Sequence, residues 1–221
     1  NNEIGNWNVS NVLDMSSMFS SSSFDKDISN WDVGSVTSFF NMFSYNTEFN
    51  QNIGNWNVSS AINMTKMFSM SSFNQDIGRW NVSSVTEMYA MFWGASDFNQ
   101  FIGKWNVSNV LNMHWMFNEA TSFNQDLTEW CVTNVNINFG LGKTEPDDFS
   151  KNSPLLETNK PVWGTCPKTS IIIDKGVYTV SYNEAYEQPN WVKYTVNNRP
   201  KNVDRGGMDF YKENGVLTSD D

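Results

Sequence analysis

The residues of this chain with the most chemistry to offer are two cysteines and one histidine. Cys131 and Cys166 are its only cysteines, and His114 is its only histidine. The cysteines could form a reactive pair, a metal site or one disulfide. Two cysteines without a histidine partner are too few for a usual zinc site. We therefore expect a disulfide, which would contribute about 3–4 kcal/mol by closing this loop and indicates an oxidising compartment.

No other combination of side chains in the sequence predicts catalysis. His114 stands at a repeat position that is held in other copies by Ser16, Phe40, Thr65 and Tyr89. Such a variable position is typical of a surface. The adjacent acids at 147–148 and 220–221 lie in a loop and at the chain end, where we expect them to be solvated. With no nucleophile–base pair, we expect no catalytic residue, no metal site and no cofactor.

A tandem repeat occupies about two-thirds of the chain and must position these residues. Its tryptophans lie 24 or 25 residues apart, at Trp7, Trp31, Trp56, Trp80, Trp105 and Trp130. Each of the first five tryptophans is followed by Val, a second Val (Ala in one copy), Met or Phe, a Met-Phe pair, a Phe and an Ile or Leu, at distances that vary by at most one residue. No single copy can bury its own apolar side, so the copies must stack into a continuous core.

Each copy contains two different sequence patterns. The Trp-x-Val end alternates as a short strand does, and Val-x-x-Met-x-x-Met-Phe has the spacings of three and four that are typical of a short helix. A strand plus a helical segment in a repeat of this length is the leucine-rich-repeat unit. The sequence therefore predicts an α/β solenoid over residues 1–140, a leucine-rich-repeat-like right-handed coil of short parallel strands and short helices.

The repeat decays after its sixth tryptophan. Residues 141–167 carry Gly and Pro in place of periodicity, which predicts a cap or linker. In residues 168–221 two alternating β-rich runs, about 177–182 and 191–196, are joined around Gln188-Pro189-Asn190. This pattern predicts a small C-terminal β-hairpin region.

The charge of the chain restricts its partners. The formal net charge is −10, and residues 1–167 hold 7 basic and 16 acidic residues. An acidic surface repels phosphate backbones, so we expect the repeat region not to bind nucleic acid. No apolar run approaches the roughly 18 residues that a membrane span requires.

A polar column runs through the repeat beside the apolar ones. An amide follows the last Phe of four copies, at Asn50, Asn74, Asn99 and Asn124. Side-chain amides can satisfy turn backbone groups of their own coil and of the next one. We expect a structural ladder here, and the alternative is a ligand site.

Positions that break the repeat are the candidates for partner binding. The residue before the repeat tryptophan is Asn in the first three copies, but the other three copies carry Arg79, Lys104 and Glu129 instead. Aromatic residues stand at positions that are mostly polar in other copies, at Phe40, Tyr89, Trp93, Phe101 and Trp115. Because aromatic residues are enriched at interfaces, these five residues predict a partner site. The alternative is packing peculiar to individual coils.

Two blocks carry a family resemblance. FNQDIGRWNVSSVTEMYAMF at 73–92 and FNQDLTEWCVTNV at 123–135 resemble the BspA-like leucine-rich repeats of bacterial surface proteins and lipoproteins. The resemblance extends over about residues 1–167. It implies secreted or cell-surface placement and a role in adhesion or in contact with a host or partner.

The tail resembles the opening strands of bacterial DNA/RNA non-specific endonucleases of the His-Me finger class. The similar pieces are YTVSYNEAYEQPNWVKYTV at 178–196 and GMDFYKENGVLTSDD at 207–221. In that family a later Asp-Arg-Gly-His motif supplies a histidine base, and an Asn holds Mg²⁺. This chain ends at Asp221, before that motif would arrive. Asp204-Arg205-Gly206-Gly207 has glycine in place of the histidine, and glycine cannot accept a proton.

Three functions are compatible with these observations. The first is a secreted or cell-surface scaffold for protein–protein interaction or adhesion, non-catalytic as given, whose partner is a protein or a host surface component. The second is the targeting part of a secreted Mg²⁺-dependent endonuclease whose catalytic half is missing. The third is a structural component of a surface or particle assembly. The oligomeric state stays open.

Overall fold

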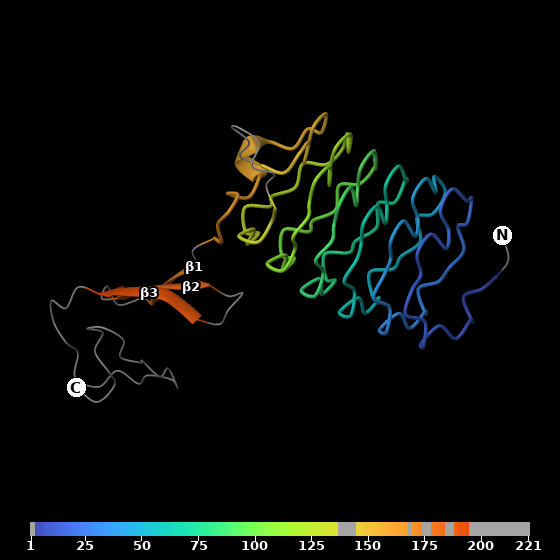
Figure 1. Cartoon of the computed structure of the whole chain (residues 1–221), viewed down its shortest axis with the longest axis horizontal. Helices are drawn as coiled ribbons and strands as arrows, with labels where there is room; N and C mark the ends of the chain where they lie inside the picture. Colours follow the sequence, from blue (N-terminus) through green and yellow to red (C-terminus); the bar gives the residue numbers. More distant parts are fainter. Residues whose placement is uncertain (1–2, 137–144, 168, 174–177, 184–187, 195–221) are drawn as a thin grey trace. The chain divides into compact units, whose positions relative to one another are not determined.

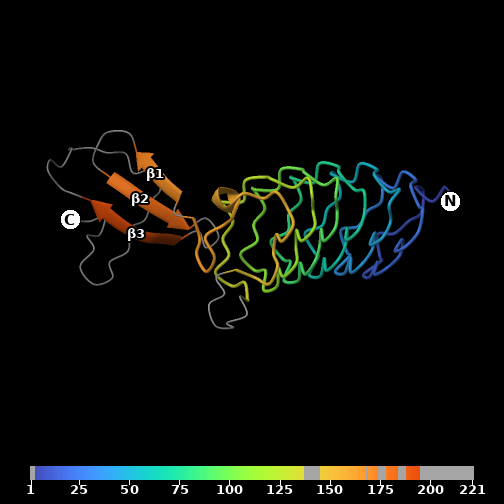
Figure 2. The ribbon, with the colours of Figure 1, turned by 90° about the horizontal axis from the view of Figure 1, so that it is seen from above.

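The computed structural model describes residues 3–136, 145–167, 169–173, 178–183 and 188–194. The chain forms two compact units, the first made of Asn1–Lys168 with Asn183–Gln188 and the second of Thr169–Tyr182 with Pro189–Asp221. The first unit is a stack of coils that follow one another along one axis (Figures 1 and 2). We number the coils by their tryptophans, so that coil 1 holds Trp7 and coils 2 to 6 hold Trp31, Trp56, Trp80, Trp105 and Trp130.

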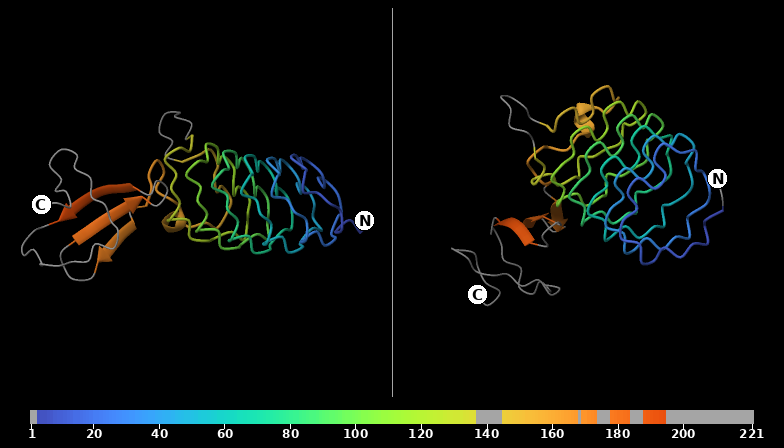
Figure 3. Two further views of the ribbon diagram at one scale, coloured as in Figure 1. Left: turned by 90° about the horizontal axis from the view of Figure 1, so that it is seen from below. Right: turned by 45° about the vertical axis from the view of Figure 1, so that its right-hand side comes forward.

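Phenylalanine rings form the centre of the stack. Phe68 of coil 3 lies 5.7 Å from Phe43 of coil 2 and 5.7 Å from Phe92 of coil 4, centroid to centroid, with the ring planes 1° and 11° apart. Within coil 3 the ring of Phe73 stacks on Phe68 at 4.1 Å. The backbone of the coils encloses an interior (Figure 3). The stacked phenylalanine rings of coils 2 to 5 are buried, together with the recurring Val, Met and Ile residues of these coils.

The repeat tryptophans do more than fill this core. In coils 2 to 6 each indole Nε1 donates a 3.1 Å hydrogen bond to a backbone carbonyl of the preceding coil, that of Ile4, Ile28, Ile53, Ile77 and Ile102 respectively. Each of these carbonyls also accepts the backbone N–H of the tryptophan in its own coil, such as Trp7 N to Ile4 O at 3.0 Å, so a phenylalanine would fill similar space but would remove the hydrogen bond that links the two coils. The indole bond therefore explains why this apolar position is always tryptophan.

The predicted α/β leucine-rich-repeat class is wrong. Residues 3–136 contain neither a helix nor a strand, and the only strand-like pairings between their coils are isolated parallel bridges: Asp14↔Ser38, Ser38↔Asn63, Asn63↔Glu87 and Glu87↔Asn112. The Trp-x-Val stretch forms no strand because a turn follows each tryptophan at once. In coil 4 the Asn81 Oδ1 accepts a hydrogen bond from the Ser83 N–H at 3.2 Å, which bends the backbone away from an extended path.

The predicted helical segment is a chain of turns with left-handed residues. We define the turn segment as residues 64–70 in coil 3 and the corresponding residues in the other coils. Lys66 and Met70 both have φ of 55°, which no α-helix contains. Backbone N–H groups of the turn segment donate hydrogen bonds to carbonyls of the next coil, Lys66 N to Tyr89 O at 2.9 Å and Phe68 N to Met91 O at 3.0 Å. The spacing of three and four therefore marks inward-facing side chains without a helix.

Residues 145–167 complete coil 6 and are not a linker. Backbone N–H groups of Trp115, Phe117 and Glu119 in coil 5 donate to the carbonyls of Asp147, Phe149 and Lys151 at 2.9, 2.7 and 2.8 Å. The same pattern joins the turn segments of all earlier coils. The 3-10 helix η1 (Glu157–Asn159) follows. The expected disulfide between Cys131 and Cys166 is confirmed, and it joins the two ends of coil 6.

The second unit contains a three-stranded sheet of order β1-β2-β3, built from β1 (Thr169–Ile173), β2 (Tyr178–Asn183) and β3 (Gln188–Tyr194). β1 pairs antiparallel with β2, with Ile171 opposite Val180. The sequence missed β1, and the turn predicted at residues 188–190 is instead the start of β3. The endonuclease-like pieces at 204–207 and 207–221 lie outside the described residues.

Glycine at one corner of the coil permits close stacking. A Cβ added to Gly78 would lie 2.5 Å from the carbonyl oxygen of Phe101 in the next coil. We expect Gly78→Ala to lower the free energy of unfolding by about 1–3 kcal/mol, because two backbones must move apart. Coil 2 accommodates Ser29 at this position, so the stack can adjust, at a cost. Urea denaturation measures the change.

Gly34→Ser is the matched control for this prediction. A Cβ at Gly34 meets only side-chain atoms, the nearest being Asp32 Oδ1 at 3.2 Å. Serine stands at this position in coils 1, 3, 4 and 5. We expect the control to keep its stability, and equal losses in the two variants would contradict the close-approach argument.

Candidate functional site

An aromatic cluster occupies the turn segments of coils 3 to 5. The Lys66 Nζ of coil 3 lies 5.7 Å from the ring centroid of Tyr89 and 5.9 Å from that of Trp93, both in coil 4. Trp93 in turn meets Trp115 of coil 5 edge to face, with centroids 5.7 Å apart and planes at 77°. All four side chains are half-buried. We call Lys66, Tyr89, Trp93 and Trp115 the aromatic cluster.

The tryptophans of the aromatic cluster differ from the repeat tryptophans. The Nε1 of Trp93 is buried and has no hydrogen-bond partner within the described part of the chain. Trp130, by contrast, is 1% exposed and donates to the carbonyl of Ile102. The Trp93 ring is therefore held in place by packing. Its contacts with the Trp115 ring and with the Lys66 cation contribute roughly 0.5–1 kcal/mol each.

The position of Trp93 holds small or polar residues in the neighbouring coils, namely Ser44, Ser69 and Asn118. These three are buried, and each has one polar atom without a partner among the described residues: Ser44 Oγ, Ser69 Oγ and Asn118 Oδ1. Such groups cost free energy when they are desolvated. The stack thus carries a row of unsatisfied polar atoms along the side where the aromatic cluster lies.

The structure divides the five aromatic residues singled out from the sequence. Tyr89, Trp93 and Trp115 come together in the aromatic cluster. Phe40 stands at the position of Tyr89 but in coil 2, with coil 3 between them, and it is 39% exposed. Phe101 is 48% exposed and belongs to a different corner of its coil, next to Gly103. Only three of the five therefore form one surface.

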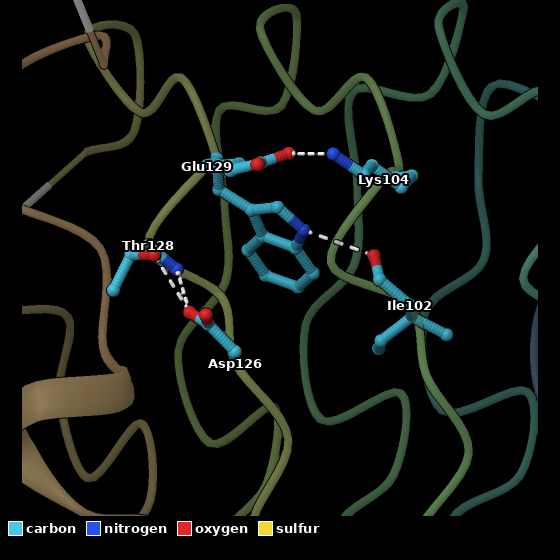
Figure 4. A network of polar contacts seen from close by, with 6 residues as sticks. Ile102, Lys104, Asp126, Thr128 and Glu129 are labelled. Atoms are coloured by element: carbon cyan, nitrogen blue, oxygen red, sulfur yellow. Dashed lines mark hydrogen bonds and ion pairs between the residues drawn. The ribbon is translucent and has the colours of Figure 1, made fainter.

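The three charged residues that precede tryptophans do not form one site either. Lys104 and Glu129 make an ion pair between coils 5 and 6 (Figure 4), with side chains 64% and 60% exposed. A surface pair of this kind is worth about 0–1 kcal/mol. Arg79 is exposed in coil 4. Because Lys104 and Glu129 bind each other, these two side chains together offer a partner little net charge.

Hydrogen bonds run along the asparagine column. The Oδ1 of Asn50 accepts from the Asn74 backbone N–H at 2.9 Å, and the Oδ1 of Asn74 accepts from the Asn99 N–H at 3.0 Å. Asn99 and Asn124 continue the series to coil 6, where Asn124 Oδ1 accepts from the Leu156 N–H at 3.1 Å. These amides bind backbone groups of the next coil, which leaves their oxygens engaged within the stack.

Side-chain-capped turns at the coil corners lower the pKa of three aspartates. The Thr128 hydroxyl, at 2.7 Å, and then its backbone N–H, at 2.9 Å, hold the pKa of Asp126 below its ordinary 3.8 (Figure 4). The Ser29 backbone N–H likewise lowers the pKa of Asp27, and the Ser16 hydroxyl and N–H lower that of Asp14. Each turn therefore favours the ionised carboxylate.

These turns predict loss of stability in acid. A folded pKa below the unfolded one stabilises the fold above about pH 3.8, and the contribution disappears as pH falls through the folded pKa. We expect the free energy of unfolding to fall between about pH 5 and pH 2, and Asp14→Asn, Asp27→Asn and Asp126→Asn together to flatten that slope. Asn52, Asn63 and Asn112 hold the same turns in other coils. Equal slopes in urea denaturation would contradict this prediction.

His114 was expected on the surface, but it is buried, with 9% exposure. Its Nδ1 accepts a hydrogen bond from the Asp147 backbone N–H at 2.7 Å. The second half of coil 6 therefore covers His114, and the sequence gave no sign of this because coil 6 departs from the repeat. Lys66 was also missed, because a lysine at a surface position carries no signal of its aromatic neighbours.

An open depression of about 520 Å³ lies in coil 6. Its acidic lining includes Glu145 and Glu157, and both bind Lys160, at 2.9 and 2.8 Å. Burial alone would lower the pKa of Lys160, but these two carboxylates raise it overall. The residues described by the structure hold no group of three or more His, Cys, Asp or Glu side chains that could bind a metal ion.

Comparisons with known proteins give one family. The family described as Mycoplasma protein of unknown function, DUF285, matches residues 1–83 and again 68–141. The two matches overlap and together extend from coil 1 into coil 6. No curated protein and no solved structure matches the chain. In the part of the chain that the structure describes, no helix has the length and apolar character needed to cross a membrane.

Proposed function

Because the chain belongs to the family described as Mycoplasma protein of unknown function, DUF285, we propose that it is a non-catalytic scaffold at the cell surface or outside the cell. The repeats of this family are associated with surface proteins, in agreement with the resemblance to BspA-like repeats. The proposed scaffold binds a protein partner through the aromatic cluster.

The observation that carries this proposal is the departure of the aromatic cluster from the repeat. Thr65 and Ser69 of coil 3 stand where coil 4 has Tyr89 and Trp93. Coil 3 stacks on its neighbours with these smaller residues, so the large rings at the same positions of coil 4 are not needed for stacking. Half-buried aromatic side chains beside a cation form the type of surface where binding energy is concentrated.

Restoring the repeat residues tests the proposal. The variant Tyr89→Thr with Trp93→Ser installs the residues of coil 3, so it should fold as the natural chain does. The immobilised full chain is exposed to detergent-solubilised surface proteins, and retained proteins are quantified by mass spectrometry. We expect a protein retained by the natural chain to be lost from this variant.

The control for this experiment is Phe101→Asp, which installs the aspartate found at the corresponding position of coil 3, Asp76. It removes an exposed aromatic ring outside the aromatic cluster. We expect the control to retain the partner. A variant that retains every protein that the natural chain retains would refute the assignment of the binding site.

We also propose that this chain does not cleave nucleic acid. The only histidine of the chain, His114, is buried, and its Nδ1 is engaged by the Asp147 backbone N–H, so it is poorly placed to take a proton from a substrate water. The family match ends at residue 141, and nothing in the comparisons supports the endonuclease resemblance of the tail. Incubation of the chain with DNA or RNA and Mg²⁺ should give no products, and clear cleavage would contradict the proposal.

A further inference from the structure

An apolar stripe runs along the stack at the position six residues after each tryptophan. Coils 1, 3 and 5 carry Leu13, Ile62 and Leu111 there, which are 62%, 48% and 47% exposed. Coils 2 and 4 carry Thr37 and Thr86, which are half-buried. We call these five residues the alternating stripe. Exposed apolar residues that gather in one place mark interaction sites, whereas single ones need no explanation.

Hydrogen bonds hold the alternating stripe in line. The N–H of Thr37 donates to the Leu13 carbonyl at 2.8 Å, and the N–H of Ile62 donates to the Thr37 carbonyl at 2.8 Å. Thr86 and Leu111 continue this series at 2.9 Å each. The Thr37 and Thr86 hydroxyls donate to the carbonyls of Leu13 and Ile62, at 3.1 and 3.5 Å, and are therefore used within the stack. Because backbones paired in this way lie about 4.8 Å apart, the large side chains recur about every 10 Å.

The surroundings of the alternating stripe carry little charge. In coils 1 to 5 the residues three and four positions after each tryptophan are all Ser, Asn or Gly. The nearest charges along the chain are those of Asp14 and Glu87, each directly after a residue of the stripe. The formal net charge of the chain is −10, so two copies repel each other in most orientations. This face is where two copies meet the least repulsion.

We infer that the alternating stripe is the contact surface between two copies of this chain. A large side chain in every second coil alternates with a smaller one, so the stripe interdigitates with a surface of the same spacing. A second copy has that spacing, and a two-fold axis between coils 3 and 4 brings the two stripes into register. This axis sets Ile62 opposite Thr86 of the second copy. It likewise sets Leu111 opposite Thr37 of the second copy.

The same axis keeps acidic groups apart and limits the size of the contact. It sets Glu87 opposite Asn63 of the second copy, so a carboxylate faces a neutral amide. Asn136, the polar residue of coil 6 at the stripe position, comes opposite Leu13. Six coils and four residues of each coil cover roughly 25 Å by 13 Å, less than the about 800 Å² per partner of a stable interface. The dimer is therefore weak and forms where the chain is concentrated.

Replacing the large residues by the threonine of coils 2 and 4 tests the inference. The variant Ile62→Thr with Leu111→Thr should fold as the natural chain does, because Thr37 and Thr86 occupy the same position. Analytical ultracentrifugation gives the mass of the full chain from about 10 μM to about 1 mM. We expect the natural chain to approach twice its monomer mass, and the variant to require a concentration roughly tenfold higher. A natural chain that stays monomeric throughout would overturn the inference.

Phe101→Asn is the matched control. Phe101 is 48% exposed, as Ile62 is, and Asn52 stands at the corresponding position of the repeat. We expect this control to self-associate as the natural chain does, and equal weakening in both variants would overturn the inference. Loss of self-association in Tyr89→Thr with Trp93→Ser, but not in the stripe variant, would overturn it in favour of the aromatic cluster. Binding of the chain to phosphatidylcholine vesicles that is lost in the stripe variant would assign the stripe to lipid instead.

Opposite charges test the register. Ile62→Lys and Thr86→Glu, made as separate variants, each place a charge in the contact, so each should self-associate less than the natural chain. In an equimolar mixture the introduced lysine and glutamate face each other across the two-fold axis. We therefore expect the mixture to associate more strongly than either variant alone. A mixture that associates no more strongly than the separate variants would overturn the register.

Discussion

Phe68→Ala is expected to lower the free energy of unfolding by about 4 kcal/mol, the middle of the range for a buried phenylalanine. Phe68 is fully buried in coil 3 and contacts rings in three coils, at 4.1 Å from Phe73 and 5.7 Å from Phe43 and Phe92. The space left by its ring cannot collapse easily, because backbone hydrogen bonds such as Phe68 N to Met91 O fix the distance between coils.

The loss should also change how the stack unfolds. Each coil contacts only its neighbours, so the free energy of unfolding of the whole stack is roughly a sum of contributions from the interfaces between coils. Weakening the middle interface separates coils 1 and 2 from coils 4 to 6. We expect urea denaturation, followed by tryptophan fluorescence and by circular dichroism, to show an earlier and broader transition in the variant.

Phe40→Ala is the control for this prediction. Phe40 is a phenylalanine of a neighbouring coil, but it is 39% exposed. Its loss should change the free energy of unfolding by less than about 0.5 kcal/mol. A small loss for Phe68→Ala, close to that of Phe40→Ala, would mean that the ring column does not hold the stack together.

The sequence predicts the composition of the core well and its backbone badly. The periodic Trp, Val, Met and Phe positions identify the inward side chains, because stacking repeats the same environment in every coil. The same pattern does not report φ. Lys66 and Met70 adopt left-handed conformations that are rare for residues other than glycine and asparagine. Their residue types therefore do not predict the turns that they form. The helix assignment failed for this reason, and the strand assignment failed because a side-chain-capped turn follows the tryptophan.

The partner site was predictable only in part, for a related reason. Departures from the repeat single out Tyr89, Trp93 and Trp115, and the structure places these three together. The sequence alone does not show which residues of different coils lie next to each other. Phe40 and Phe101 were therefore grouped with the other three aromatic residues, although they lie elsewhere on the stack. Lys66 escaped notice because its role depends on the rings of the next coil. Repeat statistics identify unusual residues, and only the stacking geometry groups them.

Removal of the disulfide has the second largest expected effect. We expect Cys131→Ser with Cys166→Ser to lower the free energy of unfolding by about 3–4 kcal/mol, the value for closing a loop of 35 residues. The bond closes coil 6, whose second half meets coil 5 through three backbone hydrogen bonds and the Phe149 ring. Reduction of the natural chain should reproduce the loss.

Hydrogen exchange distinguishes two origins of this effect. If the disulfide holds coil 6 on the stack, its removal should speed exchange at the amides of Trp115, Phe117 and Glu119, which donate to coil 6. The amides of Lys66 and Phe68, which donate within the middle of the stack, should keep their protection relative to global unfolding. If the bond acts only by restricting the unfolded chain, both sets should lose protection equally. We expect the first result, because the irregular coil 6 lacks the parallel Phe ring and the regular turns that hold coils 2 to 5 together, and it therefore depends most on a covalent link.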